Sequence, residues 1–374
     1  MPTALQFLGI FSKSREEGEK RVPIHPAHIK KLPPQIGKQI YLEEGYGKRF
    51  GFQDSDFTDH VAGIVKRSEL LEKCDAFLLM PQMIAEDLYE LPEITLAWAW
   101  AHCYLHDELT EAAIKRKLTV IGFEDMYHDH SYGRTGLHVF HQNNEIAGYS
   151  SVTHALSERG LGQHYSQMPL RAAVIGFGST GRGAVTALDT LGIRHIEVLS
   201  GRQTPDIANP IPGVQFMRLS HPQDTNSPSR VSVNGSHIHL AEYLGSFDIV
   251  VNCVEQNPAR PRTFATYEDL RYFKPESVII DVSVDLDMGF EWAQHTTLAD
   301  PLVKINDRVF YYAVTNSPAR LWQATTEKIS EALIPFLGTA LSGNEAITAD
   351  PVLGPAVQIL KGNPVDPKIV AKAM

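Results

Sequence analysis

The chain is poor in cysteine. Its 374 residues include only Cys74, Cys103 and Cys253, which lie far apart in the sequence. An odd number of dispersed cysteines provides neither a disulfide framework nor a CxxC metal pair, which excludes the class of disulfide-stapled secreted proteins. The N-terminal MPTALQFLGIF also lacks the basic start, long apolar core and cleavage site of a signal peptide. We therefore expect a cytoplasmic protein.

Long apolar runs and basic runs are also missing. The most apolar stretch, residues 94–101, is far too short to cross a bilayer. The net charge is −10, and basic residues occur only in scattered pairs such as Lys30–Lys31, whereas nucleic-acid binders normally carry a basic stripe. We expect no membrane insertion and no nucleic-acid binding, so the predicted partners are small molecules.

Strand-like and helix-like segments alternate along the chain, which is typical of parallel sheets with crossover helices. The strand candidates are residues 5–11, 39–47, 76–80, 95–101, 119–125, 172–175, 195–200, 247–254 and 277–285. Two long helices are expected, at 143–159 and 321–341, and the tail beyond them reads as a short helix with a loose end. The predicted fold class is α/β, with two doubly wound, Rossmann-like domains and a cleft between them.

The helix at 143–159 marks the expected change of domain. Residues 1–148 and 318–374 are predicted to form a discontinuous substrate and catalytic domain, because we expect the last long helix to return to the first sheet. Residues 149–317 are predicted to form the second domain, which is Rossmann-like.

A glycine-rich motif, GFGSTG at residues 176–181, follows a predicted strand and opens a predicted helix. In such a loop Gly176 permits a tight turn, Gly178 lets the backbone approach a pyrophosphate, and Gly181 allows close helix–sheet packing. Ser179 and Thr180 begin the helix, whose N-terminus faces the anion. The alternative is a glycine-rich turn without a ligand, but the complete strand–loop–helix–strand context favours dinucleotide binding.

The end of the next strand, HIEVLS, indicates which dinucleotide is bound. An NAD-type site carries Asp or Glu at this tip, where it accepts from the ribose 2′-hydroxyl. Here Glu197 lies inside the strand, and the tip reads Ser200-Gly201-Arg202. A hydroxyl followed by a guanidinium suits a 2′-phosphate, so NADP(H) is favoured over NAD(H). Residues 149–317 are therefore the predicted NADP(H)-binding Rossmann domain. A solvent-exposed turn arginine is the alternative.

Other candidate site residues lie near strand ends. His102 follows the apolar TLAWAWA, where an imidazole, titrating near neutral pH, suits a general acid/base; a core histidine bonded to backbone is the alternative. Of Asp281 and Asp285, one is expected to be structural and the other to orient a substrate amine. Arg21 is a candidate carboxylate clamp, although a surface charge is the alternative.

The sequence offers no convincing metal site. His128, His130, His138 and His141 cluster in sequence, but HDH and HVFH match no zinc signature. GxSxG and helical HExxH motifs are also missing. We expect no metal.

Several stretches together resemble a known family. RVPIHPAHIKKL, AHCY, GFGSTGRGA and VIIDVSVDLDMG are similar to the alanine dehydrogenase/pyridine nucleotide transhydrogenase superfamily, which includes saccharopine dehydrogenase. LTVIGFEDMY and HVFHQNNEIAGYSSVTHAL resemble its carboxyethylornithine synthases in particular. The resemblance covers nearly the whole chain.

The resemblance implies roles for individual residues. Arg21 would bind the keto-acid carboxylate, His102 would be the catalytic acid/base, and Asp285 would lie near the nicotinamide. The family's dehydrogenases carry a lysine on the strand before the histidine strand, whereas this region reads AFLLMPQM, with Met80 near the expected place. Plain alanine dehydrogenation is therefore in doubt, and the sequence leaves open what replaces the lysine.

These observations predict an NADPH-dependent oxidoreductase that acts on a C–N bond. The resemblance favours reductive condensation of a pyruvate-like 2-keto acid with an amino-acid amine. Two alternatives stay open: an alanine, lysine or saccharopine-type dehydrogenase that deaminates its substrate oxidatively, and a catalytically silent NADP(H) sensor. Related enzymes assemble, so a homo-oligomer is expected.

Overall fold

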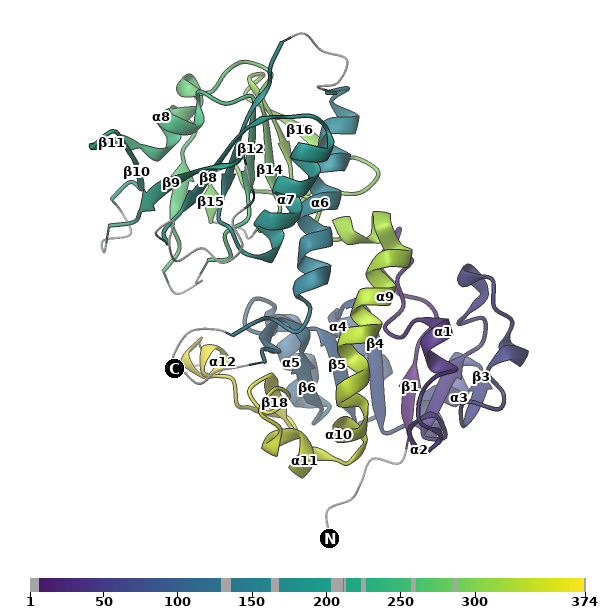
Figure 1. Ribbon diagram of the computed structural model, residues 1–374. Helices are drawn as coiled ribbons and strands as arrows, with labels where there is room; N and C mark the ends of the chain where they lie inside the picture. The colour runs from purple at the N-terminus through teal and green to yellow at the C-terminus, as the bar shows by residue number, and fades with distance from the viewer. Residues whose placement is uncertain are drawn as a thin grey trace. The chain divides into compact units, whose positions relative to one another are not determined.

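A computed structural model describes residues 7–128, 136–162, 168–202, 211, 213–222, 227–256, 260–284 and 288–372 (Figure 1). The chain forms two compact units. The first comprises residues 1–141 and 322–374, and the second comprises residues 142–321. The expected boundaries at 148/149 and 317/318 fall near these limits. The assignment of substrate to one unit and cofactor to the other stays a prediction.

The sheet of the first unit has the strand order β3-β2-β1-β4-β5-β6, extended by β18 and β19. Its strands are β1 (Leu8–Ile10), β2 (Ile40–Glu43), β3 (Gly63–Val65), β4 (Ala76–Gln82), β5 (Leu96–Trp100), β6 (Thr119–Gly122), β18 (Val357–Leu360) and β19 (Asn363–Pro364). β1 to β6 pair in parallel, and β18 pairs antiparallel with β6. The order reverses between β1 and β4, which is where ligands bind in doubly wound sheets.

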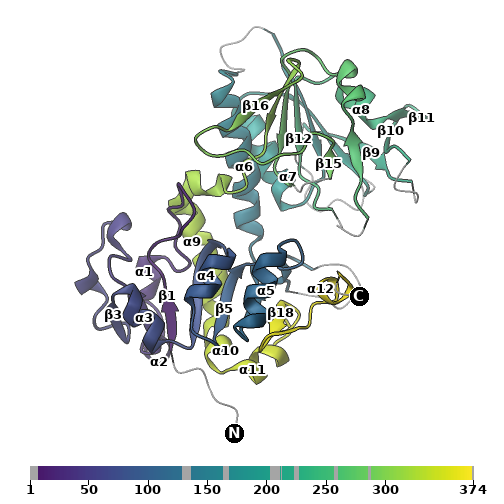
Figure 2. The ribbon, with the colours of Figure 1, turned by 180° about the vertical axis from the view of Figure 1, so that it is seen from behind.

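Helices cover both faces of this sheet, so its strands are apolar on both sides (Figures 1 and 2). Leu78 and Trp98 face α9 (Trp322–Leu333) in one cluster, and Phe77 and Ala97 face the opposite way in another. The second cluster takes side chains from α3 (Arg67–Lys73), α4 (Ala85–Glu90) and α5 (Asp107–Lys115). The shorter helices of the unit are α1 (Pro26–Ile29), α2 (Pro34–Gly37), η1 (Lys48–Phe50), η2 (Asp54–Asp56) and η3 (Phe123–Asp125).

The second unit repeats the strand order. Its sheet reads β11-β10-β9-β8-β7-β12-β14-β17-β16. The strands are β7 (Arg171–Ile175), β8 (His195–Ser200), β9 (Gln215–Ser220), β10 (Arg230–Val233), β11 (Ser236–His239), β12 (Ile249–Asn252), β14 (Val278–Asp281), β16 (Leu302–Ile305) and β17 (Val309–Tyr312). The six strands from β9 to β17 in this order are parallel, and their order reverses between β7 and β12. A two-stranded sheet joins β13 (Thr263–Ala265) and β15 (Gly289–Phe290).

Two helices of the second unit, α6 (His141–Glu158) and α7 (Ser179–Thr190), lie side by side in both views (Figures 1 and 2). Glycines make this approach possible. A Cβ at Gly148 of α6 would collide with the carbonyl oxygen of Thr180, and one at Gly183 of α7 would collide with that of Glu145. The remaining helices are α8 (Leu240–Leu244), η6 (Glu268–Tyr272) and η7 (Ser317–Leu321). Two α/β sheets with Rossmann strand order confirm the predicted α/β fold class with two doubly wound domains.

The C-terminal segment differs from expectation in two ways. The helix predicted at 321–341 is broken into α9, η8 (Ile334–Phe336) and α10 (Leu337–Leu341), because Pro335 lacks an N–H and its ring clashes with the preceding turn. The prediction of a loose tail is also wrong. After α11 (Asn344–Ala349) the chain adds β18 to the edge of the first sheet, and α12 (Pro367–Lys372) follows β19.

Candidate functional site

The glycine loop lies between β7 and α7, at the point where the second sheet reverses its strand order. Gly176 has a φ of +89°, and a Cβ there would lie 2.9 Å from Val254 Cγ2 and 3.0 Å from the Cys253 carbonyl oxygen. A Cβ at Gly181 would collide with the Gly176 carbonyl oxygen. Both positions therefore require glycine, as the motif predicted.

Gly178 differs from the other two glycines because a Cβ there would meet nothing within 4 Å. It is exposed and is the N-cap of α7, so open space lies over the first backbone N–H groups of a 12-residue helix. Ser179 and Thr180 form the half-buried start of that helix. Free N–H groups and the helix dipole suit an anionic pyrophosphate, so the loop fits a dinucleotide.

The tip of β8 reaches the same loop. Ser200 is buried, and its Oγ accepts from the backbone N–H of Arg202 at 3.1 Å. The exposed Arg202 side chain donates from Nη2 to the carbonyl oxygen of Phe177 at 2.6 Å. The guanidinium is thus held at the rim of the glycine loop, at the strand end where a Rossmann fold receives the adenosine ribose.

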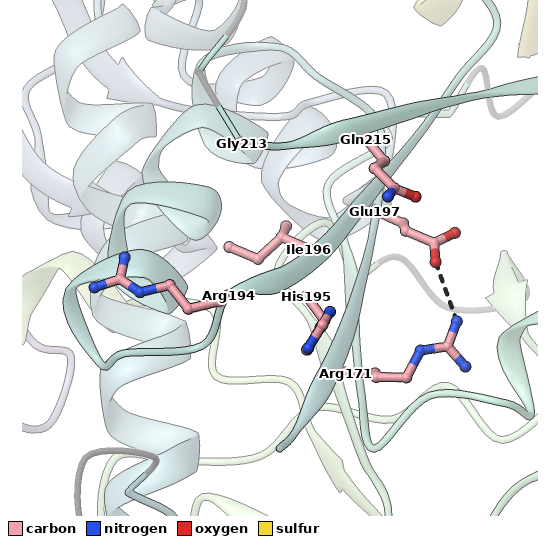
Figure 3. A pocket seen from close by; sticks show the side chains of 7 residues that line it. All are labelled: Arg171, Arg194, His195, Ile196, Glu197, Gly213 and Gln215. Carbon is pink, nitrogen blue, oxygen red and sulfur yellow. Dashed lines mark hydrogen bonds and ion pairs between the residues drawn. The ribbon is translucent and has the colours of Figure 1, made fainter.

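Glu197 lies elsewhere on the strand and is already bonded. It borders a polar pocket of about 210 Å³ near the amino ends of β7, β8 and β9 (Figure 3). Glu197 Oε1 accepts from Arg171 Nη2 at 3.1 Å, and Oε2 accepts from the hydroxyl of Tyr243, whose pKa is raised by burial and by this carboxylate. The Glu197 carboxylate is therefore not at the carboxyl end of β8, beside the glycine loop, where an NAD-type site would carry an acidic residue.

In the first unit, the segment after β1 contains a buried ion pair. The Arg21 side chain donates from Nε and Nη2 to the two carboxylate oxygens of Glu19, at 2.9 and 2.7 Å. Both side chains are at most 4% exposed. The surface-charge alternative for Arg21 is wrong. The pair uses the Nε side of the guanidinium, and Nη1 is not part of it.

Glu16 lies near this pair. Burial, together with the neighbouring charge of Glu19, raises the pKa of Glu16 to about 7. The segment after β1 therefore combines a fixed guanidinium with a carboxyl group that titrates near neutrality.

His102 follows β5 at the carboxyl edge of the first sheet. Its φ is +44°, a left-handed conformation that non-glycine residues rarely adopt. The ring is 31% exposed, and its Nδ1 makes no hydrogen bond to the described residues. Glu124 Oε1 is 3.9 Å from Nδ1, which is beyond hydrogen-bond distance. A strained residue with an unpaired ring nitrogen at a strand end is typical of a functional site.

Glu124 and Gln358 lie next to His102, and neither was predicted from the sequence as a site residue. Glu124, in η3 after β6, accepts from the backbone N–H groups of Ala101 and His102. Gln358, on β18, donates to Glu124 Oε1 at 2.6 Å. The position of Glu124 directly after a parallel strand was a usable signal. Gln358 had none, because its strand was not predicted.

Of the two aspartate candidates, Asp281 is the one among the described residues. It ends β14 and is fully buried, and it accepts from Asn252 Nδ2 and from the Tyr311 hydroxyl, each at 2.8 Å. These bonds are those of a structural carboxylate. Asp285 lies outside the described residues, so its role stays a prediction.

The histidine cluster is only partly described, because His130 lies outside the described residues. His138 Nε2 lies 3.3 Å from the Glu124 carbonyl oxygen, and burial lowers the pKa of His138 to about 4. In the part of the chain that the structure describes, no three His, Cys, Asp or Glu side chains are grouped to hold a metal ion. The same part contains no helix long and apolar enough to cross a membrane.

Met80, near the place of the family lysine, lies on β4 and is 9% exposed. It packs in the apolar cluster that includes Trp98 and Phe123. This part of the strand therefore provides no amine for catalysis.

The fold, the glycine loop after β7 and the segment after β1 that contains Arg21 define a class of protein. This class is that of pyridine-nucleotide oxidoreductases with two Rossmann-like domains. Residues 10–147 match the N-terminal domain of the alanine dehydrogenase/PNT family, and residues 160–367 match its C-terminal domain. The chain belongs to this family.

Individual relatives are distant but match over most of their length. The chain is 25% identical to an N(5)-(carboxyethyl)ornithine synthase of Clostridium botulinum, over 84% of this chain and 88% of the relative. It is also 25% identical to an alanine dehydrogenase of Geobacillus stearothermophilus, over 97% and 94%. A solved L-alanine dehydrogenase has the same fold, with a TM-score of 0.74 at 18% identity, over 97% of this chain and 98% of that one.

Proposed function

We propose that the chain, an oxidoreductase that acts on CH–NH or CH–NH2 groups, uses NADPH to condense a pyruvate-like 2-keto acid with the amine of an amino acid. The buried Met80 carries this proposal, because the resemblance implies a lysine there in the enzymes that act on simple amino acids. The similarity to N(5)-(carboxyethyl)ornithine synthase over most of both chains supports it.

The residues of the first unit have distinct tasks in this reaction. Arg21, oriented by Glu19, binds the carboxylate of the keto acid. The amine of the second substrate adds to the carbonyl carbon. His102 then donates a proton to the departing hydroxyl, so that water leaves and an imine remains. When bound, the cofactor supplies the hydride that reduces this imine.

Preference for NADPH belongs to the proposal as well. The second unit would hold the pyrophosphate over Gly178 and the start of α7, with the 2′-phosphate beside Ser200 and Arg202. A guanidinium pairs well with phosphate, and no carboxylate from Glu197 opposes it there.

Simple oxidative deamination is the second candidate. The similarity to an alanine dehydrogenase over 97% of this chain favours it. The third is a nucleotide sensor without turnover, which the lack of a lysine at Met80 favours.

One assay separates these functions. Consumption of NADPH is followed with pyruvate and a panel of amines that includes ammonia, ornithine and lysine, and the product mass is measured. We expect turnover with a diamino acid and a product whose mass is that of both substrates joined with loss of water and gain of two hydrogens. Turnover with ammonia alone identifies a simple dehydrogenase. Binding of NADPH without turnover on the whole panel identifies a sensor.

Homo-oligomer formation and a cytoplasmic location stay predictions. Sedimentation equilibrium of the purified chain tests the first, and fractionation of the source cells tests the second.

A further inference from the structure

We propose that Gln358, contributed by the C-terminal strand β18, is a positioning residue that holds Glu124 against the main chain of His102 and so keeps the imidazole free for proton transfer. The inference rests on the proposed role of His102 as acid/base. Gln358 is fully buried and more than two hundred residues from either partner in sequence.

The amide of Gln358 is bonded at both ends. Its Nε2 donates to Glu124 Oε1 at 2.6 Å and to Asp125 Oδ2 at 2.7 Å. Its Oε1 accepts from the backbone N–H of Cys103 at 3.1 Å. One side chain therefore joins the acidic turn after β6 to the residue that follows His102.

The backbone of β18 is irregular at this residue. Val357 pairs with Ile121 and Ile359 pairs with Val120, so the register shifts at Gln358. An extra residue in one strand redirects a side chain, and such bulges are common beside active sites. The register shift thus falls at the residue whose side chain reaches η3.

Gly122 supplies the space. A Cβ at this position of β6 would collide with Gln358 Nε2 and would lie 2.6 Å from Glu124 Oε1. Its own N–H is bonded to the Ala356 carbonyl oxygen at 3.0 Å, just before β18. The bulge and the missing Cβ thus serve the same contact.

The consequence for His102 follows from the bonds of Glu124. Its Oε2 accepts from Ala101 N at 3.1 Å, and its Oε1 accepts from His102 N as well as from Gln358. Since Oε1 is already bonded twice, it stays 3.9 Å from His102 Nδ1. Without the amide donor, we expect Oε1 to turn to the ring and form an ion pair with the imidazolium.

Charged and titratable groups from several elements surround this carboxylate and ring. They are Glu124 and Asp125 of η3, Cys103 and Tyr104 after β5, His138 before α6 and His141 at its start, and Asp366 and Lys368 of the C-terminal segment. Lys368 Nζ pairs with Asp125 Oδ1 at 3.0 Å, and His138 is neutral near pH 7 because burial lowers its pKa to about 4. Glu124 is therefore a carboxylate that lies within 4 Å of the His102 ring and also accepts a hydrogen bond from Gln358.

The test compares Gln358→Leu with Lys368→Met in the full-length enzyme. Lys368→Met cuts another contact between the C-terminal segment and η3 but leaves Glu124 bonded. For Gln358→Leu we expect kcat to fall about tenfold to a hundredfold, as a displaced catalytic group produces, with the KM for NADPH unchanged. The histidine limb of its pH–rate profile should move to higher pH, because an imidazolium paired with Glu124 retains its proton. Lys368→Met also removes a cation that interacts with Glu124, so the histidine limb of its profile should move much less than that of Gln358→Leu.

The His102 ring titration provides a readout that does not need turnover. In protein labelled at the histidine ring carbons, the signal lost in His102→Gln identifies the residue, and its midpoint should rise in Gln358→Leu. If that variant does not fold, Gln358→Asn, whose shorter amide cannot reach Glu124, should give the same shift. An unchanged ring titration and pH limb in the folded variant would overturn the proposal, whatever happens to kcat. Failure of the proposed function is separate, since it is lack of turnover by the unaltered enzyme.

Discussion

The two units have the same order of six parallel strands and differ in the segment that leaves the first strand. In the second unit, β7 passes through three glycines directly into a 12-residue helix. In the first, β1 leads into a charged segment in which Arg21 and Glu19 form a buried pair. One turn leaves the start of a helix open, where we propose that a phosphate binds, and the other fixes a guanidinium, which we propose binds a carboxylate. Strand order thus sets where ligands bind, and the connections decide which ligand.

If this division is correct, the largest effect comes from His102. The variant His102→Ala should lose about two to four orders of magnitude in kcat, because proton transfer to the leaving hydroxyl is lost. NADPH binding, measured by calorimetry, should be unchanged, since His102 belongs to the first unit. His237→Ala, which removes an exposed histidine of β11 in the second unit, is the control. Turnover close to normal in His102→Ala would contradict the proposed role of His102 as acid/base.

The buried pair comes next. Arg21→Met leaves the Glu19 carboxylate buried without its partner, which costs about 3–5 kcal/mol in free energy of unfolding. Urea unfolding followed by tryptophan fluorescence measures this, because Trp98, Trp100 and Trp322 lie in the first unit.

The matched control for this pair is the double variant Arg21→Met with Glu19→Gln, in which no buried charge is left. We expect it to recover much of the stability but not the binding of the keto acid. Equal stability of the single and double variants would show that the pair is not buried in solution.

Arg202 tests the other unit. Arg202→Ala should weaken NADPH binding about 10- to 100-fold, the usual value of charge-assisted hydrogen bonds, and leave NADH binding unchanged. Arg194 lies just before the opposite end of β8 (Figure 3) and pairs with Asp189, so Arg194→Ala should alter neither. Equal weakening of both nucleotides by Arg202→Ala would mean that the guanidinium only supports the loop through Phe177.

Much of this organisation was predictable from sequence, because it depends on local patterns. The glycine spacing predicted the turn at 176–181, and alternating strands and helices predicted two doubly wound sheets. His102 was located by its position after an apolar strand. The residues around His102 were not predicted, because Gln358 reaches Glu124 from a four-residue antiparallel strand inside a segment rich in proline and glycine. Contacts distant in sequence leave no periodic trace, and Pro335 divided a helix whose hydrophobic pattern is continuous.

Glu16 gives the smallest expected effect and tests how the segment after β1 uses its charges. The folded-state pKa of about 7 exceeds the ordinary value of 4.5, so the folded protein binds this proton more tightly than the unfolded chain. Stability from this group is complete below pH 4.5 and is lost as the pH rises to 7. Glu16→Gln should therefore leave the free energy of unfolding unchanged at pH 4 and raise it by about 1–2 kcal/mol at pH 8, with allowance for solvent screening.

The exposed neighbour provides the control for Glu16. Glu17→Gln removes the same charge one residue away and should give a constant difference across this range. If both variants show the same pH dependence, net charge rather than the burial of Glu16 beside Glu19 and Arg21 is responsible. A gain confined to Glu16→Gln, fully developed near pH 7, would show that the first unit holds a carboxyl group ready to change charge next to its guanidinium.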